Sequence, residues 1–498
     1  MPTNILLIMA DQLRADALAC NGNPVIETPN LDRLARTGVN CTACYTPAPI
    51  CVPARAALAT GCYPHRCTGT KNNEGAILPG FPLLPAELAA AGYRTYATGK
   101  LHYLPYAPPG EPRVTHGFQV AEVAESGRAL GKWDPEGRLR GLEDYLDYLH
   151  EVGWGGYSRA NGLGNNDVFA SASQMPSEHY VDAWVATRAI HHLDRHLQEH
   201  RGRPFFLFAS FPKPHSAFDP PRPYDARYDP RQMPDPTGSV ELLAERGLTA
   251  LASRPAEYEW NKLSPEARRT IKAHYYGLVT FQDLQVGRLL DFLEQRGLRE
   301  DTLVVFTADH GEMLGDFGHY FKETFYEGSA RVPLIASQPG TLPEGRREEG
   351  LIGLHDLMPT LLAAAGEPVP AGIDGVDLSA MLRGGGPVRE ALVAQCHDAP
   401  RQQYMVRDRR WKYIYHQDGA VEELFDLDAD PHELCDLSGS ASEPAASRRR
   451  SLRSWLIDWC RRHGDEAMLD GDDLAAADAR PHFRRPPPEY SPFGRRFY

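Results

Sequence analysis

The stretch Asn4-Ile-Leu-Leu-Ile-Met-Ala-Asp11 is apolar from its second residue until it ends on a carboxylate. A continuous apolar run of this kind is typical of a strand that is buried on both faces of a parallel sheet. Helices must then cover both faces of that sheet. The run at residues 4–9 therefore predicts a strand at the centre of an α/β fold.

The same pattern returns along the chain, with amphipathic segments between the apolar runs. Further strands are predicted at residues 94–98, 205–209 and 302–307. Helices are predicted after Thr28, at residues 85–91 and in a long segment that ends near Gly297, each placed by caps or by three-to-four spacing. This alternation predicts a large, mixed and mostly parallel sheet flanked by helices.

Polar side chains follow four of these predicted strands. They are Asp11, Lys100 with His102, His215, and Asp309 with His310. In open α/β sheets ligands bind beyond the carboxyl ends of the strands, so we expect these loops to meet at one crevice. Taken singly, each residue also has a structural explanation, such as a helix cap, a surface charge or a hydrogen-bonded histidine.

A second stretch, Cys51-Val-Pro-Ala-Arg55, precedes alanine-rich sequence that ends in Thr60-Gly61. A cysteine at the start of a helix lies where backbone N–H groups and the helix dipole favour an anion. Arg55 adds a cation one turn later. This arrangement suits a nucleophile that acts on an anionic ester. A half-buried cysteine without chemistry is the alternative, and these two residues alone do not separate the readings.

The candidate residues divide by their chemistry. Asp11 and Asp309 are hard oxygen donors suited to Ca²⁺, Mg²⁺ or Mn²⁺, and His310 shifts the preference somewhat toward Mn²⁺. Cationic or donor side chains would surround the remaining side: Arg55, Lys100, His102, His215 and Lys322. A divalent ion with such donors is what a transferring tetrahedral oxyanion requires.

Composition excludes several classes of protein. The formal net charge of −13 over 498 residues argues against nucleic acid as a partner. The first residues lack the pattern of a signal peptide, and no run is long enough to span a membrane, so a cytoplasmic location is predicted. Nine cysteines, including the pair Cys41 and Cys44, are then expected to be free thiols rather than disulfides or a metal pair.

The chain divides into three parts. Residues 1–385 are predicted to form the catalytic α/β domain, which ends at the Gly-Gly-Gly-Pro run. Within residues 386–480, antiparallel strands are predicted at residues 404–407, 411–415 and 424–427 and a helix at residues 448–460, which indicates a smaller α+β subdomain. The tail at residues 481–498 combines prolines, arginines and aromatics without a core pattern. It could be disordered, or it could dock on a neighbouring subunit, which leaves a homodimer or a homotetramer open.

Together the motifs resemble the formylglycine-dependent type I sulfatases of the alkaline phosphatase superfamily. The resemblance runs from about residue 4 to residue 440 and follows the family's order. It is carried by the Cys51–Arg55 stretch and by the blocks Asn4-Ile-Leu-Leu-Ile-Met-Ala-Asp11, Thr98-Gly-Lys100-Leu-His102, Pro214-His215, Thr307-Ala-Asp309-His310-Gly-Glu, His355-Asp-Leu-Met-Pro-Thr360, Trp411-Lys-Tyr-Ile and Glu423-Leu-Phe-Asp. Seven ordered blocks make the match specific.

The resemblance implies an alkaline phosphatase-like fold and a set of roles. Cys51 would be oxidised to formylglycine by a maturation enzyme, and its hydrate would attack the sulfur of a small sulfate ester. Asp11, Asp309, His310 and the modified residue 51 would bind one divalent metal, with Ca²⁺ ahead of Mn²⁺ or Mg²⁺. Arg55 and Lys100 would steady the hydrate, and His102 would help its collapse. His215 and Lys322 would hold the sulfate and help to protonate the leaving oxygen.

Two residues depart from the commoner family pattern. Gln12 stands where many members have a second aspartate, and His310 stands where many have asparagine. Both variants resemble choline sulfatases and phosphonate monoester hydrolases. The Lys100 and His102 pair favours sulfate monoesters, with a phosphonate monoester or phosphodiester hydrolase as the first alternative. A catalytically silent anion-binding homologue is the second.

Overall fold

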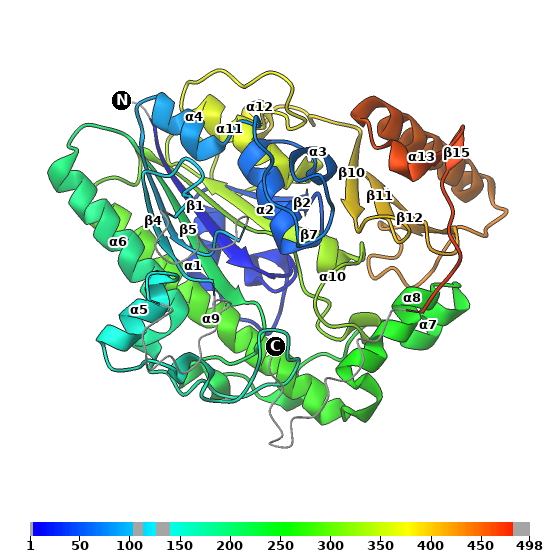
Figure 1. Cartoon of the computed structure of the whole chain (residues 1–498), viewed down its shortest axis with the longest axis horizontal. Coiled ribbons are helices and arrows are strands. Elements are labelled where there is room, and N and C mark those ends of the chain that lie inside the picture. Colours follow the sequence, from blue (N-terminus) through cyan, green and yellow to red (C-terminus); the bar gives the residue numbers. More distant parts are fainter. Residues whose placement is uncertain (1–2, 103–112, 126–139, 482–498) are drawn as a thin grey trace.

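The computed structural model describes residues 3–102, 113–125 and 140–481. Within them, one large sheet is covered by helices on both faces, and a smaller sheet lies beside it (Figure 1). The tail predicted at residues 481–498 lies almost entirely outside the described residues. No helix in the described residues has the length and apolarity needed to cross a membrane.

The large sheet is mixed and mostly parallel, as the sequence predicts. Its order is β4-β3-β5-β1-β6-β7-β2-β8, and β9 also pairs with β2. Only β7 runs antiparallel to its neighbours β6 and β2. The strands are β1 Asn4–Asp11, β2 Val39–Tyr45, β3 Arg94–Gly99, β4 Val120–Val123, β5 Phe205–Pro214, β6 Thr302–Ala308, β7 Arg331–Ser337, β8 Arg346–Glu348 and β9 Ile352–Gly353.

The first apolar run occupies the centre of this sheet. Strand β1 pairs in parallel with β5 on one side and with β6 on the other, so that Leu7 lies opposite both Phe208 and Val305. Every residue of β1 after Asn4 is buried. Burial on both faces explains why this strand lacks polar alternation.

Two groups of helices cover the sheet. Helices α1, α6 and α9 pack together, and α2, α4 and α11 form the other group (Figure 1). The α-helices are α1 Pro29–Arg36, α2 Cys51–Thr60, α3 Pro64–Cys67, α4 Leu84–Ala90, α5 Asp144–Glu151, α6 Val181–Glu199, α7 Val240–Glu245, α8 Thr249–Ser253, α9 Pro265–Gln295, α10 Glu327–Ala330, α11 Leu357–Ala364, α12 Ser379–Leu382 and α13 Glu443–His463.

A separate antiparallel sheet follows the glycine run. Its strands, in both spatial and chain order, are β10 Ala391–Cys396, β11 Gln403–Asp408, β12 Trp411–His416 and β13 Val421–Asp426. Helix α13 packs on β11 and β12, and the two-residue strands β14 Leu469–Asp470 and β15 Asp473–Leu474 form a short hairpin.

Eight strands of the described structure have no counterpart in the sequence-based prediction: β2, β4, β7, β8, β9, β10, β14 and β15. Strands β2 and β7 carry polar residues or Pro333 within their runs, which breaks the apolar pattern. Strand β10 lies shortly after the Gly-Gly-Gly-Pro run at the predicted domain boundary, where no strand was predicted. Cys41 and Cys44 lie in β2 as buried thiols without a disulfide, as expected.

Candidate active site

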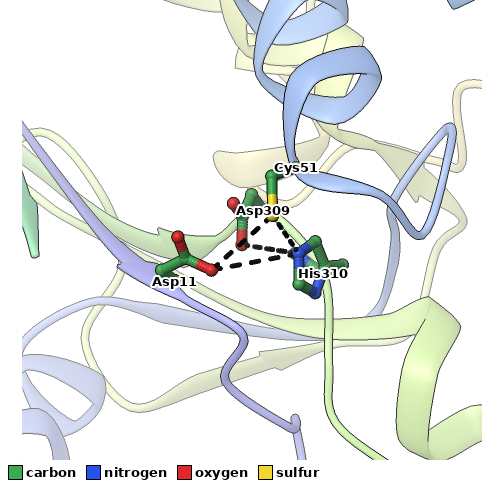
Figure 2. A group of neighbouring side chains, drawn as sticks. All are labelled: Asp11, Cys51, Asp309 and His310. Carbon is green, nitrogen blue, oxygen red and sulfur yellow. Dashed lines mark hydrogen bonds and ion pairs between the residues drawn. The ribbon is translucent and has the colours of Figure 1, made fainter. Parts of the chain in front are cut away.

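The predicted crevice forms at the carboxyl ends of four adjacent strands. Asp11 is the last residue of β1, Lys100 directly follows β3, and His215 directly follows β5. Asp309 and His310 directly follow β6. Cys51 is the first residue of helix α2 and points toward these loops (Figure 2).

Four buried side chains form a compact donor cluster in this crevice. Ligand atoms of Asp11, Cys51, Asp309 and His310 all lie within 4.8 Å of one another. Cys51 Sγ is 3.0 Å from His310 Nε2 and 4.0 Å from Asp11 Oδ1. His310 Nδ1 lies 2.9 Å from the Gly311 carbonyl oxygen, which only accepts, so Nδ1 carries the proton in that bond and Nε2 faces the cluster.

This donor set fits a divalent cation. Two carboxylates, an imidazole nitrogen and the residue at position 51 are ligand types that Ca²⁺, Mn²⁺ or Mg²⁺ accept in different proportions. Burial raises the pKa of Asp11, but Lys100, His215, Arg55 and His310 outweigh it and hold that pKa well below its ordinary value. Asp11 is therefore ready as an ionised ligand.

Arg55 forms hydrogen bonds with Asp309 of the cluster and with two neighbouring residues. Its guanidinium donates through Nε to Asp309 Oδ2 at 2.7 Å and through Nη1 to Ser210 Oγ at 2.9 Å and the Lys100 carbonyl at 2.8 Å. Nη2 lies 3.5 Å from Asp11 Oδ2 but has no hydrogen-bond partner in the described part of the chain. One buried donor thus remains for a ligand at the cluster.

Lys100 and Lys322 approach the cluster from different sides. Lys100 Nζ pairs with Asp11. Lys322 Nζ lies 3.0 Å from His215 Nε2 and 2.6 Å from Gln12 Oε1. Burial raises the pKa of the Cys51 thiol, but cations led by Lys322 outweigh it and lower the pKa to about 7.

His102 follows Lys100 in a left-handed backbone conformation, with φ of 58°. Its backbone N–H and that of Leu101 both donate to Glu125 Oε1 at 2.9 Å. The His102 ring is buried at the edge of the crevice. The carboxylate of Glu125 thereby fixes the turn that carries Lys100 and His102 out of β3.

The structure brings in three residues to which the sequence analysis assigned no role. Ser210 accepts a hydrogen bond from Arg55, and Glu125 holds the turn after β3. Glu312 accepts a hydrogen bond from Gln12. Gln12 and Glu312 both adjoin predicted ligands, which was the signal in the sequence. Ser210 lies inside the apolar run of β5, where no local pattern marks it.

Together the sheet and its strand-end site define an α/β enzyme of the alkaline phosphatase-like fold. The family model described as Sulfatase matches residues 3–367, and the model described as N-sulphoglucosamine sulphohydrolase, C-terminal, matches residues 315–455. The chain belongs to the sulfatase family, which is a family of sulfuric ester hydrolases. The family and the fold predicted from the sequence are thus confirmed.

Individual relatives cover nearly the whole chain. The arylsulfatase of Clostridium perfringens is 30% identical, over 95% of this chain and 97% of its own length. The choline-sulfatase of Rhizobium meliloti is also 30% identical, over 96% and 95%. The crystal structure of the phosphonate monoester hydrolase of Agrobacterium radiobacter matches with a TM-score of 0.77 and 26% identity, over 93% of this chain and 96% of that chain.

Proposed function

We propose that the chain hydrolyses sulfate monoesters to an alcohol and inorganic sulfate, with residue 51 as the source of the nucleophile. The observation that carries the proposal is the position of Cys51. It is fully buried at the start of α2, with Sγ 3.0 Å from His310 Nε2 and within reach of both carboxylates of the cluster. A buried cysteine with a purely structural role does not require charged and polar side chains around its sulfur.

Two groups would complete this site. A divalent cation held by Asp11, Asp309, His310 and residue 51, with Ca²⁺ ahead of Mn²⁺ or Mg²⁺, would supply a Lewis acid for the sulfate oxygens. Oxidation of Cys51 to formylglycine by a maturation enzyme would supply, after hydration, one hydroxyl to attack sulfur and a second to expel sulfate.

The chain's own residues hold and polarise the reacting groups. Asp309 accepts N–H groups from Gln12 and His310 on Oδ1 and from Arg55 on Oδ2, and these bonds orient its carboxyl group beside residue 51. Arg55 and Lys100 neutralise the two carboxylates. We assign to His102, at the crevice edge, the proton transfer that regenerates the nucleophile.

The leaving group would meet the other pair of side chains. Lys322 and His215 are in hydrogen-bond contact at 3.0 Å, and both are buried. Lys322 and His215 would hold the sulfate oxygens and would help to protonate the leaving oxygen.

A phosphonate monoester or phosphodiester hydrolase is the second candidate. It is favoured by Gln12 and His310, and by the likeness to the phosphonate monoester hydrolase of Agrobacterium radiobacter. Lys100 and His102 favour a sulfate monoester. The positive charge of Lys100 and a proton donor at His102 suit the step in which the hydrate collapses and expels sulfate.

Relative turnover separates the candidates. We expect the protein, purified from its native host, to hydrolyse 4-nitrophenyl sulfate faster than 4-nitrophenyl phenylphosphonate. A clear preference for the phosphonate would reverse the assignment, and turnover of neither would leave an anion-binding homologue. Peptide mass spectrometry across Cys51 tests the modification, since an unmodified thiol throughout would exclude the mechanism.

Three further expectations belong to the same proposal. We expect a small sulfate ester as the substrate, a cytoplasmic location and a homodimer or homotetramer. Light scattering coupled to size-exclusion chromatography measures the oligomer directly. A monomer at micromolar concentration would remove the proposed docking role of residues 481–498.

A further inference from the structure

The side chain of Gln12 lies between two charged residues that are distant in the sequence. Its Oε1 is 2.6 Å from Lys322 Nζ, and its Nε2 is 2.5 Å from Glu312 Oε2. All three side chains are buried. Gln12 is the residue that replaces the second aspartate of the commoner family pattern, and it is not one of the four side chains of the donor cluster.

The polarity of these hydrogen bonds determines which way the Gln12 amide faces. Glu312 Oε1 accepts the backbone N–H groups of Leu314 at 2.8 Å and Phe321 at 2.5 Å. Among the described residues, the NH₂ group of Gln12 is the donor within hydrogen-bond distance of the second oxygen of Glu312. The amide oxygen must then point at Lys322, which as an ammonium can only donate.

Lys322 is held on a second side by His215. His215 Nδ1 lies 2.8 Å from the Ser216 carbonyl oxygen and so donates to it, which leaves a lone pair on Nε2 for Lys322 at 3.0 Å. In the described part of the chain, Gln12 and His215 are the hydrogen-bond partners of Lys322 Nζ. One N–H of the three remains for a substrate oxygen.

The backbone on either side of Lys322 adopts an unusual conformation. Phe321 and Glu323, on either side of Lys322, both adopt left-handed conformations, with φ of 69° and 74°. The Phe321 N–H that donates to Glu312 belongs to this segment. Glu312 therefore anchors the backbone before Lys322 and, through Gln12, the ammonium at the end of its side chain.

We propose that Glu312 and Gln12 are positioning residues that orient the Lys322 ammonium toward the anionic group of the substrate. The inference rests on the proposed function, in which Lys322 binds the sulfate oxygens. Neither residue touches the reacting atoms. Both act through Lys322, by excluding every amide orientation except the one that accepts from it.

A polarity swap tests this arrangement. In Glu312→Gln one carboxylate oxygen becomes an NH₂ group, so a donor faces either the Gln12 amide or the two backbone N–H groups. We expect kcat/KM for 4-nitrophenyl sulfate to fall at least about tenfold. In Gln12→Glu/Glu312→Gln the carboxylate at position 12 accepts from Lys322 and from the amide at position 312, whose oxygen again serves both backbone groups. We expect this double variant to recover to within about threefold of the wild type.

Two controls separate positioning from loss of folding. Glu27→Gln, at a half-exposed glutamate paired with Arg227, should change nothing. When Lys322 is already replaced by alanine, adding Glu312→Gln should lower kcat/KM only slightly further, because Glu312 acts through Lys322. A second readout is the affinity of the purified holoenzyme for inorganic sulfate by isothermal titration calorimetry. This affinity should fall in Lys322→Ala and in Glu312→Gln, and return in the double variant.

The outcomes are distinct. If Glu312→Gln keeps wild-type turnover and sulfate affinity, or if the double variant folds but does not recover, the inference is wrong. If the wild type turns over neither ester, the proposed reaction fails, and the sulfate titration still decides whether Glu312 orients Lys322. A wild type that does not bind sulfate overturns both.

Discussion

Cys51 combines full burial with close polar neighbours, and this distinguishes it from the other cysteines. Its pKa is lowered to about 7, because the cations led by Lys322 outweigh burial. Burial raises the pKa of Cys67 to about 12, and no cation is among the leading causes of that shift in the described residues. At the residue scale, the site is a set of charges that compensate one another at short range.

We predict that Cys51→Ala removes turnover of 4-nitrophenyl sulfate by at least about a thousandfold, since it deletes the nucleophile. The melting temperature should stay near that of the wild type, because alanine fits the start of α2. Cys435→Ala, at an exposed cysteine, is the matched control and should be fully active. Wild-type rates in Cys51→Ala would refute the nucleophile assignment.

Metal content gives a second prediction at this scale. We expect about one divalent ion per chain by elemental mass spectrometry, because the four donors converge on one point. Asp11→Asn and His310→Ala should each lower occupancy, whereas His116→Ala, a buried histidine outside the cluster, should not. Full occupancy in both ligand variants would place the ion elsewhere. Reloading with Ca²⁺, Mn²⁺ or Mg²⁺ separately would rank the metals.

At the scale of elements, the carboxyl ends of β3 and β5 determine where Lys100 lies. Gly99 closes β3 with φ of 99°, and a Cβ there would overlap the Ser210 carbonyl oxygen. The same carbonyl accepts the Lys100 N–H at 2.9 Å, and Ser210 Oγ accepts from Arg55. Close approach of two strands thus positions two cations of the site.

We predict that Gly99→Ala lowers the free energy of unfolding by more than about 2 kcal/mol and also lowers kcat, because β3 must move away from β5. Gly92→Ala, just before the same strand, is the control. Its φ of 93° is similar, but no atom lies within 4 Å of the added Cβ. It should cost only about 1 kcal/mol of backbone strain and leave kcat unchanged. If Gly99→Ala and Gly92→Ala change the urea unfolding free energy and kcat equally, the prediction is wrong.

At the scale of the whole molecule, a buried ion-pair network joins the two sheets. Lys412 of β12 is fully buried and donates to the Phe325 carbonyl at 2.8 Å, Glu433 at 2.7 Å and Glu327 at 2.6 Å. Phe325 and Glu327 lie in the segment that follows Lys322. The smaller sheet therefore supports the loop that brings Lys322 to the site.

We predict that Lys412→Met destabilises the protein by about 3–5 kcal/mol, because the buried Glu433 loses its cation and Glu327 keeps only its ion pair with Arg331. Arg410→Met removes a surface arginine that pairs with Asp426 at the end of β13, and should leave stability nearly unchanged. Urea unfolding measures both variants. Similar stability of the two would show that the network contributes little to holding the sheets together.

Much of this architecture could be read from local patterns. Apolar runs followed by polar residues placed Asp11, Lys100, His215 and Asp309 correctly at the ends of strands. Strands such as β2, β7 and β10 were missed, because pairing with neighbouring strands stabilises a strand even where its own residues show no regular apolar pattern. The division at residue 385 stays a prediction.

The sequence by itself determined the fold class and the family, because the buried parallel strands and the ordered motifs are local properties of the chain. It also determined which end of the sheet carries the site, since the carboxyl ends of parallel strands lie together. Only the tertiary structure decided the partners of Gln12. Lys322 and Glu312 lie 310 and 300 positions from it, and chain closure brings them together. The orientation of an amide depends on which donor and which acceptor face it, and no local pattern encodes that choice.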